Sequence, residues 1–345
     1  MSAEFQPTPK LADARPARTA KGAPPARTSK GAPPARTALT MVALALASTG
    51  GLAWLPTSRG QAPPDAAFIA AALLTLVLAA YGLQRVAALD GPRWAAPLSA
   101  ALFGGWVLVA WQIGVTALEV PRVLLPAPAA IGQSLLEHAP TLGRDFVQTV
   151  LKAVLVGWLL GSALGFAVAV AIDRLPFLQR GLLPVASLSS TVPLVAVAPI
   201  MVMWFGFDWP SKAAVVVLMT FFPMLVATLA GLQAAGKLER ELMHSYAAGY
   251  FRTLLALRLP CAVPFIVSAL KVNATLALIG AIVAEFFGSP TVGLGFRIST
   301  EAARMNMALV WGAIVVAAVT GSVAYALLVQ LERRLAFWHP SIRSR

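Results

Sequence analysis

Long apolar runs dominate the chain after residue 38 and alternate with short segments that carry most of the charges. About 20 apolar residues are enough for a helix to cross the hydrocarbon core of a bilayer. Runs of near-spanning length lie at residues 38–55, 66–84, 95–117, 148–172, 182–206, 212–233, 263–287 and 307–331. The pattern predicts an all-α, polytopic membrane protein with about eight transmembrane helices. A signal-peptide core is the alternative for the first run, but its long basic leader favours a membrane helix.

Composition agrees with this prediction and narrows the chemistry. Hydrophobic residues make up 58% of the chain and charged residues only 12%, which exceeds the apolar usage of ordinary globular proteins. The single cysteine, Cys261, excludes an internal disulfide framework. His138, His244 and His339 are too scattered to suggest a metal cluster, so we assign no metal site.

Residues 1–38 are rich in Pro, Ala, Lys and Arg and contain the octapeptide KGAPPART twice, at 21–28 and 30–37. Such a composition cannot bury a core, so we expect a disordered, solvated cytoplasmic tail. Attraction of its basic residues to anionic lipid or nucleic acid is the alternative, and we expect no nucleic-acid partner. Met41 is a second possible translation start.

Basic residues gather on one side of the predicted membrane. Of the 27 Lys and Arg residues, 19 fall on the side of the N-terminus and six on the other, while Lys152 and Lys271 lie within spans. Lys and Arg are enriched in cytoplasmic segments of membrane proteins. We therefore expect both termini, and the segment at residues 234–260, to be cytoplasmic.

Residues 234–260, which we call the loop, form the one long polar interruption in the second half of the chain. Apolar residues recur there with helical spacing, at Met243, Tyr246, Ala247, Tyr250 and Leu254. Gly249 can supply a left-handed stop between two short helices, and Pro260 can close the second. The pattern predicts a helix–turn–helix docking surface.

The stretch ELMHSYAAGYFRTLLALRLP, residues 241–260, resembles the cytoplasmic loop of ABC importer permeases. That family's pattern is EAA, three residues, G, nine residues, I-x-LP. Glu241 matches the motif Glu, and Leu257, Leu259 and Pro260 match I-x-LP. Ala247 stands in the glycine position, with Gly249 two residues later.

The resemblance extends from residue 92 to the C-terminus, toward the branch that imports nitrate, sulfonates, taurine and pyrimidine precursors. The matching segments include TVLKAVLVGWLLGSALG at 149–165, VPLVAVAPIMVMWFGF at 192–207 and IVAEFFGSPTVGLGF at 282–296. The family has a six-helix, type I permease core. The resemblance thus implies that residues 93–340 form this core and that residues 39–92 are two accessory transmembrane helices.

By the same resemblance, the chain is expected to be a non-enzymatic permease subunit without a bound cofactor, moving a small polar or anionic solute across a bacterial inner membrane. The implied partners are ABC ATPase subunits inside, a solute-binding protein outside, membrane lipid and a second copy of the chain. The residues implied in coupling to the ATPase are Arg240, Glu241, Tyr246, Ala247, Gly249, Leu259 and Pro260.

Two other classes of function stay open at this stage. A secondary transporter or exporter would work without an ATPase, and a membrane enzyme would need a convergent acid, base or metal cluster. The stretch GLQAAGK at residues 231–237 nearly completes a phosphate-binding loop, but Leu238 replaces the required Ser or Thr. We therefore expect ATP hydrolysis on a separate chain.

Three charged residues lie within the predicted spans, where an ionisable group needs a partner or water. Lys271 and Glu285 are 14 residues apart on one helix, which separates them by about 21 Å and prevents pairing. Lys152 is expected at a depth where it pairs with Glu285. Direct contact of these groups with solute along the translocation path is the alternative.

Overall fold

The computed structural model describes residues 95–175, 194–288 and 291–337, together with the isolated positions 70, 77, 80 and 81. The predicted tail and the two predicted accessory helices lie almost entirely outside these residues. α3 (Ala95–Ala117) crosses from one compact unit into another at Trp106. In the first unit Phe103 stacks on Trp106, with ring centroids 6.0 Å apart. The second unit, from Val107 onward, holds every other helix discussed below.

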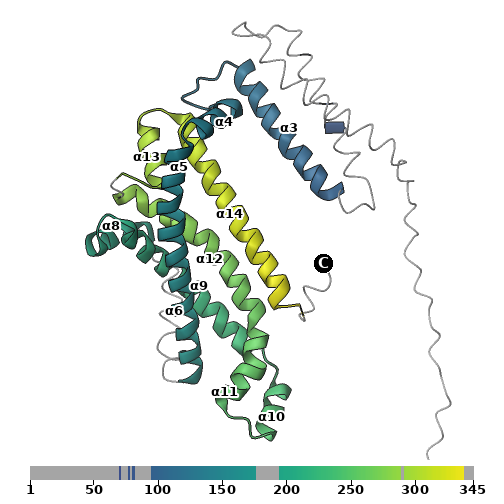
Figure 1. Ribbon diagram of the computed structural model, residues 1–345. Coiled ribbons are helices and arrows are strands. Elements are labelled where there is room, and N and C mark those ends of the chain that lie inside the picture. Colours follow the sequence, from purple (N-terminus) through teal and green to yellow (C-terminus); the bar gives the residue numbers. More distant parts are fainter. Residues whose placement is uncertain are drawn as a thin grey trace, which may run out of the picture. The chain divides into compact units, whose positions relative to one another are not determined.

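All secondary-structure elements in the described part of the second unit are helices (Figure 1). Its elements are α4 (Pro128–Glu137), α5 (Ala139–Phe146), η1 (Val147–Val154), α6 (Leu155–Arg174), α8 (Leu194–Phe205), α9 (Trp209–Gln233), α10 (Lys237–Ser245), α11 (Tyr250–Thr253), η2 (Leu254–Arg258), α12 (Leu259–Gly288), α13 (Leu294–Ala303) and α14 (Met307–Leu335). Here η marks a π-helical stretch. The short helices α4, α5 and α13 were not predicted.

Five helices in the described residues are long and apolar enough to span a membrane: 100–117, 139–174, 209–233, 250–288 and 307–335. They confirm the all-α, polytopic fold class and coincide with five of the predicted spans. The third span of the core was predicted at residues 182–206, and only its second half, α8, is described.

α6 packs directly on α9 through a stripe of glycines. A Cβ atom at Gly157 would lie 2.6 Å from the Cβ of Val216, and one at Gly161 would lie 2.7 Å from the carbonyl oxygen of Val217. Gly165 meets the carbonyl of Phe221 in the same way. Small residues allow such close backbone approach, on which helix packing in lipid depends. The close approach of α9 thus explains why glycine recurs every four residues on α6.

α12 lies against both α6 and α9 and is tied to them by one buried amide. The Asn273 side chain, fully buried, donates to Ser162 Oγ at 3.1 Å on α6 and to the Thr220 carbonyl at 2.8 Å on α9. In a bilayer no water is available to such a group, so polar partners must come from neighbouring helices. Asn273 therefore fixes the register of three helices.

The expectation that Pro260 closes the second helix of the loop is wrong. Helical structure runs without interruption from Tyr250 to Gly288, and Pro260 lies in the first turn of α12. η2 immediately precedes it, with the Leu259 N–H bonded to the Leu254 carbonyl five residues earlier. Proline lacks the N–H that an α-helical turn needs, and a π-helical turn changes the local bonding pattern so that the helix can continue.

Candidate functional site

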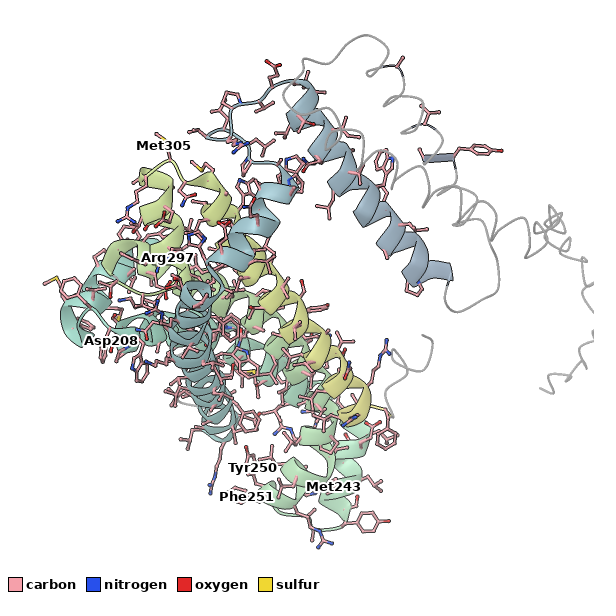
Figure 2. All side chains as sticks on the ribbon, turned by 45° about the horizontal axis from the view of Figure 1, so that its top comes forward. Asp208, Met243, Tyr250, Phe251, Arg297 and Met305 are labelled. Atoms are coloured by element: carbon pink, nitrogen blue, oxygen red, sulfur yellow. The ribbon has the colours of Figure 1, made fainter. Side chains whose placement is uncertain are left out.

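The loop stands at one end of the bundle. Figure 1 shows α10 and α11 beyond the ends of α9 and α12, and Figure 2 places Met243, Tyr250 and Phe251 at this end. Asp208 and Arg297 lie toward the opposite end of the same helices (Figure 2). We call these the loop end and the far end.

A left-handed residue ends α10, but it is Ala247 and not Gly249. The backbone φ of Ala247 is 51°, whereas Gly249 has φ −66° and ψ 170° and precedes α11 as its N-cap. The Ala248 N–H donates to the Met243 carbonyl at 3.0 Å, and the Ala247 N–H to the His244 carbonyl at 2.9 Å. These two bonds form a Schellman motif, whose left-handed position usually holds glycine. The prediction that Gly249 supplies the turn is therefore wrong, because the end of α10 sets the position.

The break at residues 246–249 also redistributes the predicted apolar stripe. Leu254 turns inward and is 6% exposed, while Tyr246 is 75% exposed. The outward side of α10 instead carries Leu238, Leu242 and Tyr246, which recur every four residues. We call these three side chains the ridge. Glu241 on the same helix is exposed, and no described residue pairs with its carboxylate.

Arg240 holds α10 against the end of α9. Its guanidinium donates to the Ala235 carbonyl at 2.6 and 3.0 Å and to the Gln233 carbonyl at 3.2 Å. The last carbonyls of a helix have no partner within the helix, and a basic side chain can satisfy them. The charge assigned to coupling from the sequence thus fixes the angle at which the loop leaves the bundle.

A second set of contacts anchors the other limb of the loop. The Arg258 guanidinium makes two hydrogen bonds of 2.6 Å to the two carboxylate oxygens of Asp173 at the end of α6. Arg258 Nε also donates to the Leu232 carbonyl in α9 at 3.0 Å. The Tyr250 hydroxyl donates to Asp173 at 3.0 Å. We call Asp173, Arg258 and Tyr250 the clamp, because together they join α6, α9 and the start of the loop-to-α12 helix.

Aromatic side chains of α11 extend the clamp. The guanidinium of Arg174 lies 5.8 Å from the ring centroid of Tyr250 and 5.0 Å from that of Phe251. Both distances are within the range of cation–π attraction. Leu259 and Pro260, also assigned to coupling, lie half-buried in the first turn of α12.

The predicted pair of Lys152 with Glu285 is wrong. Glu285 is 2% exposed and accepts from Thr149 Oγ1 and from the Gly295 N–H, each at 2.7 Å. Its carboxylate therefore caps the N-terminus of α13, where helix dipole and free N–H groups favour an anion. A Cβ at Gly293 would lie 2.6 Å from the Glu285 carboxyl carbon, and its φ is +145°, so glycine is required there.

Lys152 is exposed and donates to Gln148 Oε1 at 3.1 Å. It lies three residues after the buried Thr149 in η1, so the two side chains leave the helix in different directions. Apolar run length placed Lys152 close to the level of Glu285 along the bundle. The prediction failed because Lys152 projects from a different face of η1. Lys271, the third intramembrane charge, pairs with Glu332 of α14 at 2.8 Å.

Two buried charges at the far end were not identified from the sequence. Lys212 is 2% exposed and donates to the carbonyls of Phe207 and Gly288. Asp145 is fully buried and accepts from Arg297 Nε at 2.8 Å and from the Gly293 N–H at 2.9 Å. The hydrogen bond that Arg297 donates to Asp145 raises the pKa of Arg297. Asp145 thus anchors α13 on α5, and Lys212 joins the start of α9 to the end of α12.

An open cavity of about 690 Å³ also lies at the far end. Its polar lining residues are Arg144, Gln148, Lys152, Asp208 and Thr291. Hydrogen bonds from the Trp209 N–H and the Gln148 amide lower the pKa of Asp208. Arg144 has no ion-pair partner among the described residues, so positive groups remain available to a ligand.

The described residues contain no group of three or more His, Cys, Asp or Glu side chains that could hold a metal ion. What they offer is an exposed ridge on a rigid loop at one end, and a polar cavity at the other.

Comparison with known proteins finds a matching family and several similar proteins. Residues 161–337 match the model of the binding-protein-dependent transport system inner membrane component family. A probable ABC transporter permease protein of Haemophilus influenzae is 33% identical over 219 residues, which cover 64% of this chain and 89% of that protein. The formylaminopyrimidine transport permease of Halalkalibacterium halodurans is 30% identical, over 70% of this chain and 96% of its own. The taurine transport system permease of Escherichia coli is 26% identical, over 69% and 88%.

Proposed function

Because this chain belongs to the binding-protein-dependent transport system inner membrane component family, we propose that its loop, residues 234–260, docks onto a separate ABC ATPase. The chain is a multi-pass membrane permease subunit of an ABC importer of the nitrate, sulfonate and taurine branch. The comparisons support this function and not a secondary transporter or exporter.

The ridge carries the docking proposal. Leu238, Leu242 and Tyr246 are 77%, 55% and 75% exposed on a helix that projects from the bundle. Large apolar side chains fixed on a rigid element are the residues that dominate protein interfaces when a partner pocket receives them. The neighbouring carboxylate of Glu241 fixes orientation through charge complementarity.

The clamp gives the docked loop a mechanical connection to the membrane helices. A movement of the ATPase reaches α11 and η2 first, and Asp173 and Leu232 receive it through Arg258. Arg240 ties the other limb to α9. ATP binding and hydrolysis therefore move α6, α9 and α12 together, and a second copy of the chain completes the pathway between two such bundles.

The far end faces the outside in this arrangement, and the loop end and both termini face the cytoplasm. The excess of Lys and Arg on the loop side supports this orientation. The cargo, a small polar or anionic solute delivered by a binding protein, enters past Lys152 and Arg144 in the far-end cavity. Relatives named for formylaminopyrimidine and taurine transport are consistent with such a cargo.

Co-purification tests the docking proposal. The permease is expressed with the ATPase encoded nearest to it, and a tag on the permease retains both proteins. Leu242→Glu places a charge in the centre of the ridge and is expected to reduce the retained ATPase at least ten-fold. Leu136→Glu is the matched control, because Leu136 is 81% exposed on α4 at the far end.

The amount of permease inserted in the membrane should be equal for the two variants, since neither side chain is buried. Retention of the ATPase by the Leu242→Glu variant at the control level would contradict docking through the ridge. Loss of ATPase from both variants would show that a glutamate on any exposed surface disturbs the complex.

A further inference from the structure

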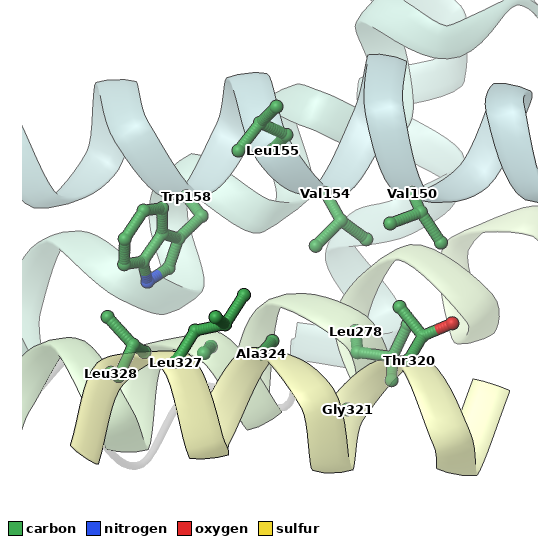
Figure 3. A pocket seen from close by; sticks show the side chains of 11 residues that line it. Val150, Val154, Leu155, Trp158, Leu278, Thr320, Gly321, Ala324, Leu327 and Leu328 are labelled. Atoms are coloured by element: carbon green, nitrogen blue, oxygen red, sulfur yellow. The ribbon is translucent and has the colours of Figure 1, made fainter. Parts of the chain in front are cut away.

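A narrow apolar groove opens between η1–α6, α12 and α14, away from the loop and the far-end cavity. Figure 3 shows Val150, Val154 and Trp158 on one wall and Thr320, Leu327 and Leu328 on the other. Its volume is about 240 Å³. All three walls belong to helices that are long and apolar enough to span the membrane.

Small residues create the groove. Ala274 on α12 and Gly321 and Ala324 on α14 lie where larger side chains would bring the helices into full contact. A Cβ at Gly321 would lie only 3.2 Å from Leu278 Cδ2, so even one added carbon narrows the space. The rim stays open, since Leu155 is 44% and Leu327 59% exposed.

The lining offers no free hydrogen-bonding group to a polar solute. Trp158 Nε1 donates to the Leu270 carbonyl at 3.2 Å, and Thr320 Oγ1 donates to the Val316 carbonyl at 2.7 Å. Every other lining side chain is apolar. An apolar occupant is therefore favoured, and an acyl chain of the surrounding bilayer is such a group.

Charge beyond the groove specifies which lipid fits. Thr320, Leu327 and Arg334 recur every seven residues on α14, so they lie close to one helix face. Arg334 is about 10 Å beyond Leu327 along the axis, at the loop end of the helix. It is exposed and has no ion-pair partner among the described residues, whereas Glu332 nearby is already paired with Lys271.

We propose that this groove binds one acyl chain of an anionic phospholipid, whose phosphate contacts Arg334. The groove runs from Thr320 to Leu328, about 12 Å along α14, which suits the part of an acyl chain below its ester group. The bound chain fills the space between α6 and α14 and leaves both helices free to separate. The proposal does not rest on docking of the ATPase.

Native mass spectrometry of the full-length chain, purified in detergent, tests the site. Equal amounts of phosphatidylglycerol and phosphatidylcholine with identical acyl chains are added. The wild type is expected to retain one phosphatidylglycerol in preference. Ala324→Phe fills the groove and should abolish this retention, whereas Val323→Phe, on an adjacent position that is 53% exposed and does not line the groove, should not.

The headgroup contact has its own pair of variants. Arg334→Gln should weaken phosphatidylglycerol binding about five-fold, as expected for one basic residue near a charged lipid, and leave phosphatidylcholine binding unchanged. Arg333→Gln is the control, since Arg333 is exposed on a different face of α14. Equal losses in both variants would overturn the assignment of Arg334.

A second measurement keeps the proposal testable if Ala324→Phe does not fold. Phosphatidylglycerol with brominated acyl chains quenches tryptophan fluorescence on contact. The fraction of fluorescence that it quenches should therefore be smaller in the Trp158→Phe variant than in the wild type. Unchanged quenching would overturn binding in the groove. Disulfide cross-linking of two chains through Ala324→Cys, in a Cys261→Ala background, would likewise overturn it by showing that a second copy covers the groove.

Discussion

Asp173 and Arg258 face each other across 85 residues of sequence and form two parallel hydrogen bonds of 2.6 Å. Their side chains are 7% and 13% exposed, so the pair is largely removed from solvent. Bidentate carboxylate–guanidinium pairs combine strength with a fixed geometry. This pair therefore joins the end of α6 to the loop with little angular freedom.

Replacing Asp173 by Asn should uncouple ATP hydrolysis from transport. The variant leaves the Arg258 charge without its counterion, at a cost of about 2 kcal/mol in folding stability. Reconstituted vesicles with the ATPase and binding protein are expected to hydrolyse ATP at the basal rate but lose the stimulation by loaded binding protein.

Arg258→Lys provides the comparison for that experiment, because it keeps the charge and removes the bidentate geometry. It should lose part of the stimulation and little stability. If stimulation follows thermal stability across both variants, the clamp serves only to hold the fold together.

Ala247→Gly should stabilise the permease. Ala247 holds φ 51°, a left-handed conformation that costs a residue with a Cβ about 1 kcal/mol, and glycine removes this strain. Thermal unfolding of the purified chain should shift upward by a degree or more. Gly249→Ala is the control and should change little, because Gly249 has negative φ and a Cβ there would meet nothing within 4 Å.

Glu285→Gln should reduce the amount of folded permease, since the carboxylate accepts hydrogen bonds from both Thr149 and the N-terminus of α13. The amide replaces one acceptor oxygen by a donor, at a cost of about 2 kcal/mol. Size-exclusion chromatography of a fluorescent fusion measures the folded fraction. Lys152→Met should be neutral and should not rescue Glu285→Gln; rescue would restore the Lys152–Glu285 pair as the better account.

Membrane orientation can be tested with two introduced cysteines in a Cys261→Ala background. Asp208→Cys should react with an impermeant maleimide applied outside intact cells, because Asp208 is exposed at the far end. Lys237→Cys, at the start of the loop, should react only after the membrane is opened. The reverse pattern would place the loop outside and remove the ATPase from its reach.

Apolar run length was enough to locate the five described membrane helices, although two of them, 139–174 and 250–288, extend beyond the predicted spans. The loop was found from its polarity and its family resemblance. Its turn was misplaced by two residues, because residue type favoured Gly249 whereas the hydrogen bonds that end α10 force Ala247 into the left-handed conformation.

The hydrogen-bond partners of the buried charged residues could not be predicted from the sequence, unlike the membrane helices and the loop. Glu285 is satisfied by backbone N–H groups of α13, which every residue carries and no sequence pattern reveals. Asp173 and Arg258 each stand close to a span boundary, where charges are common, so neither was conspicuous. An acidic residue at the end of an apolar run, facing a basic residue in the loop, is the signal that was available.

The glycine contact between α6 and α9 has a mechanical consequence. Because α6 presents only backbone to Val216 and to the carbonyls of Val217 and Phe221, it has no side chains at these positions that could repack if one helix slid along the other. The pair therefore acts as a stiff lever, and its arm from Gly157 to the clamp at Asp173 is about 24 Å long. When the loop end of α6 and α9 tilts, the far end of the pair is expected to move with it, because the two helices do not deform between the two ends. We therefore expect the flexibility of the bundle to lie on the side of α14.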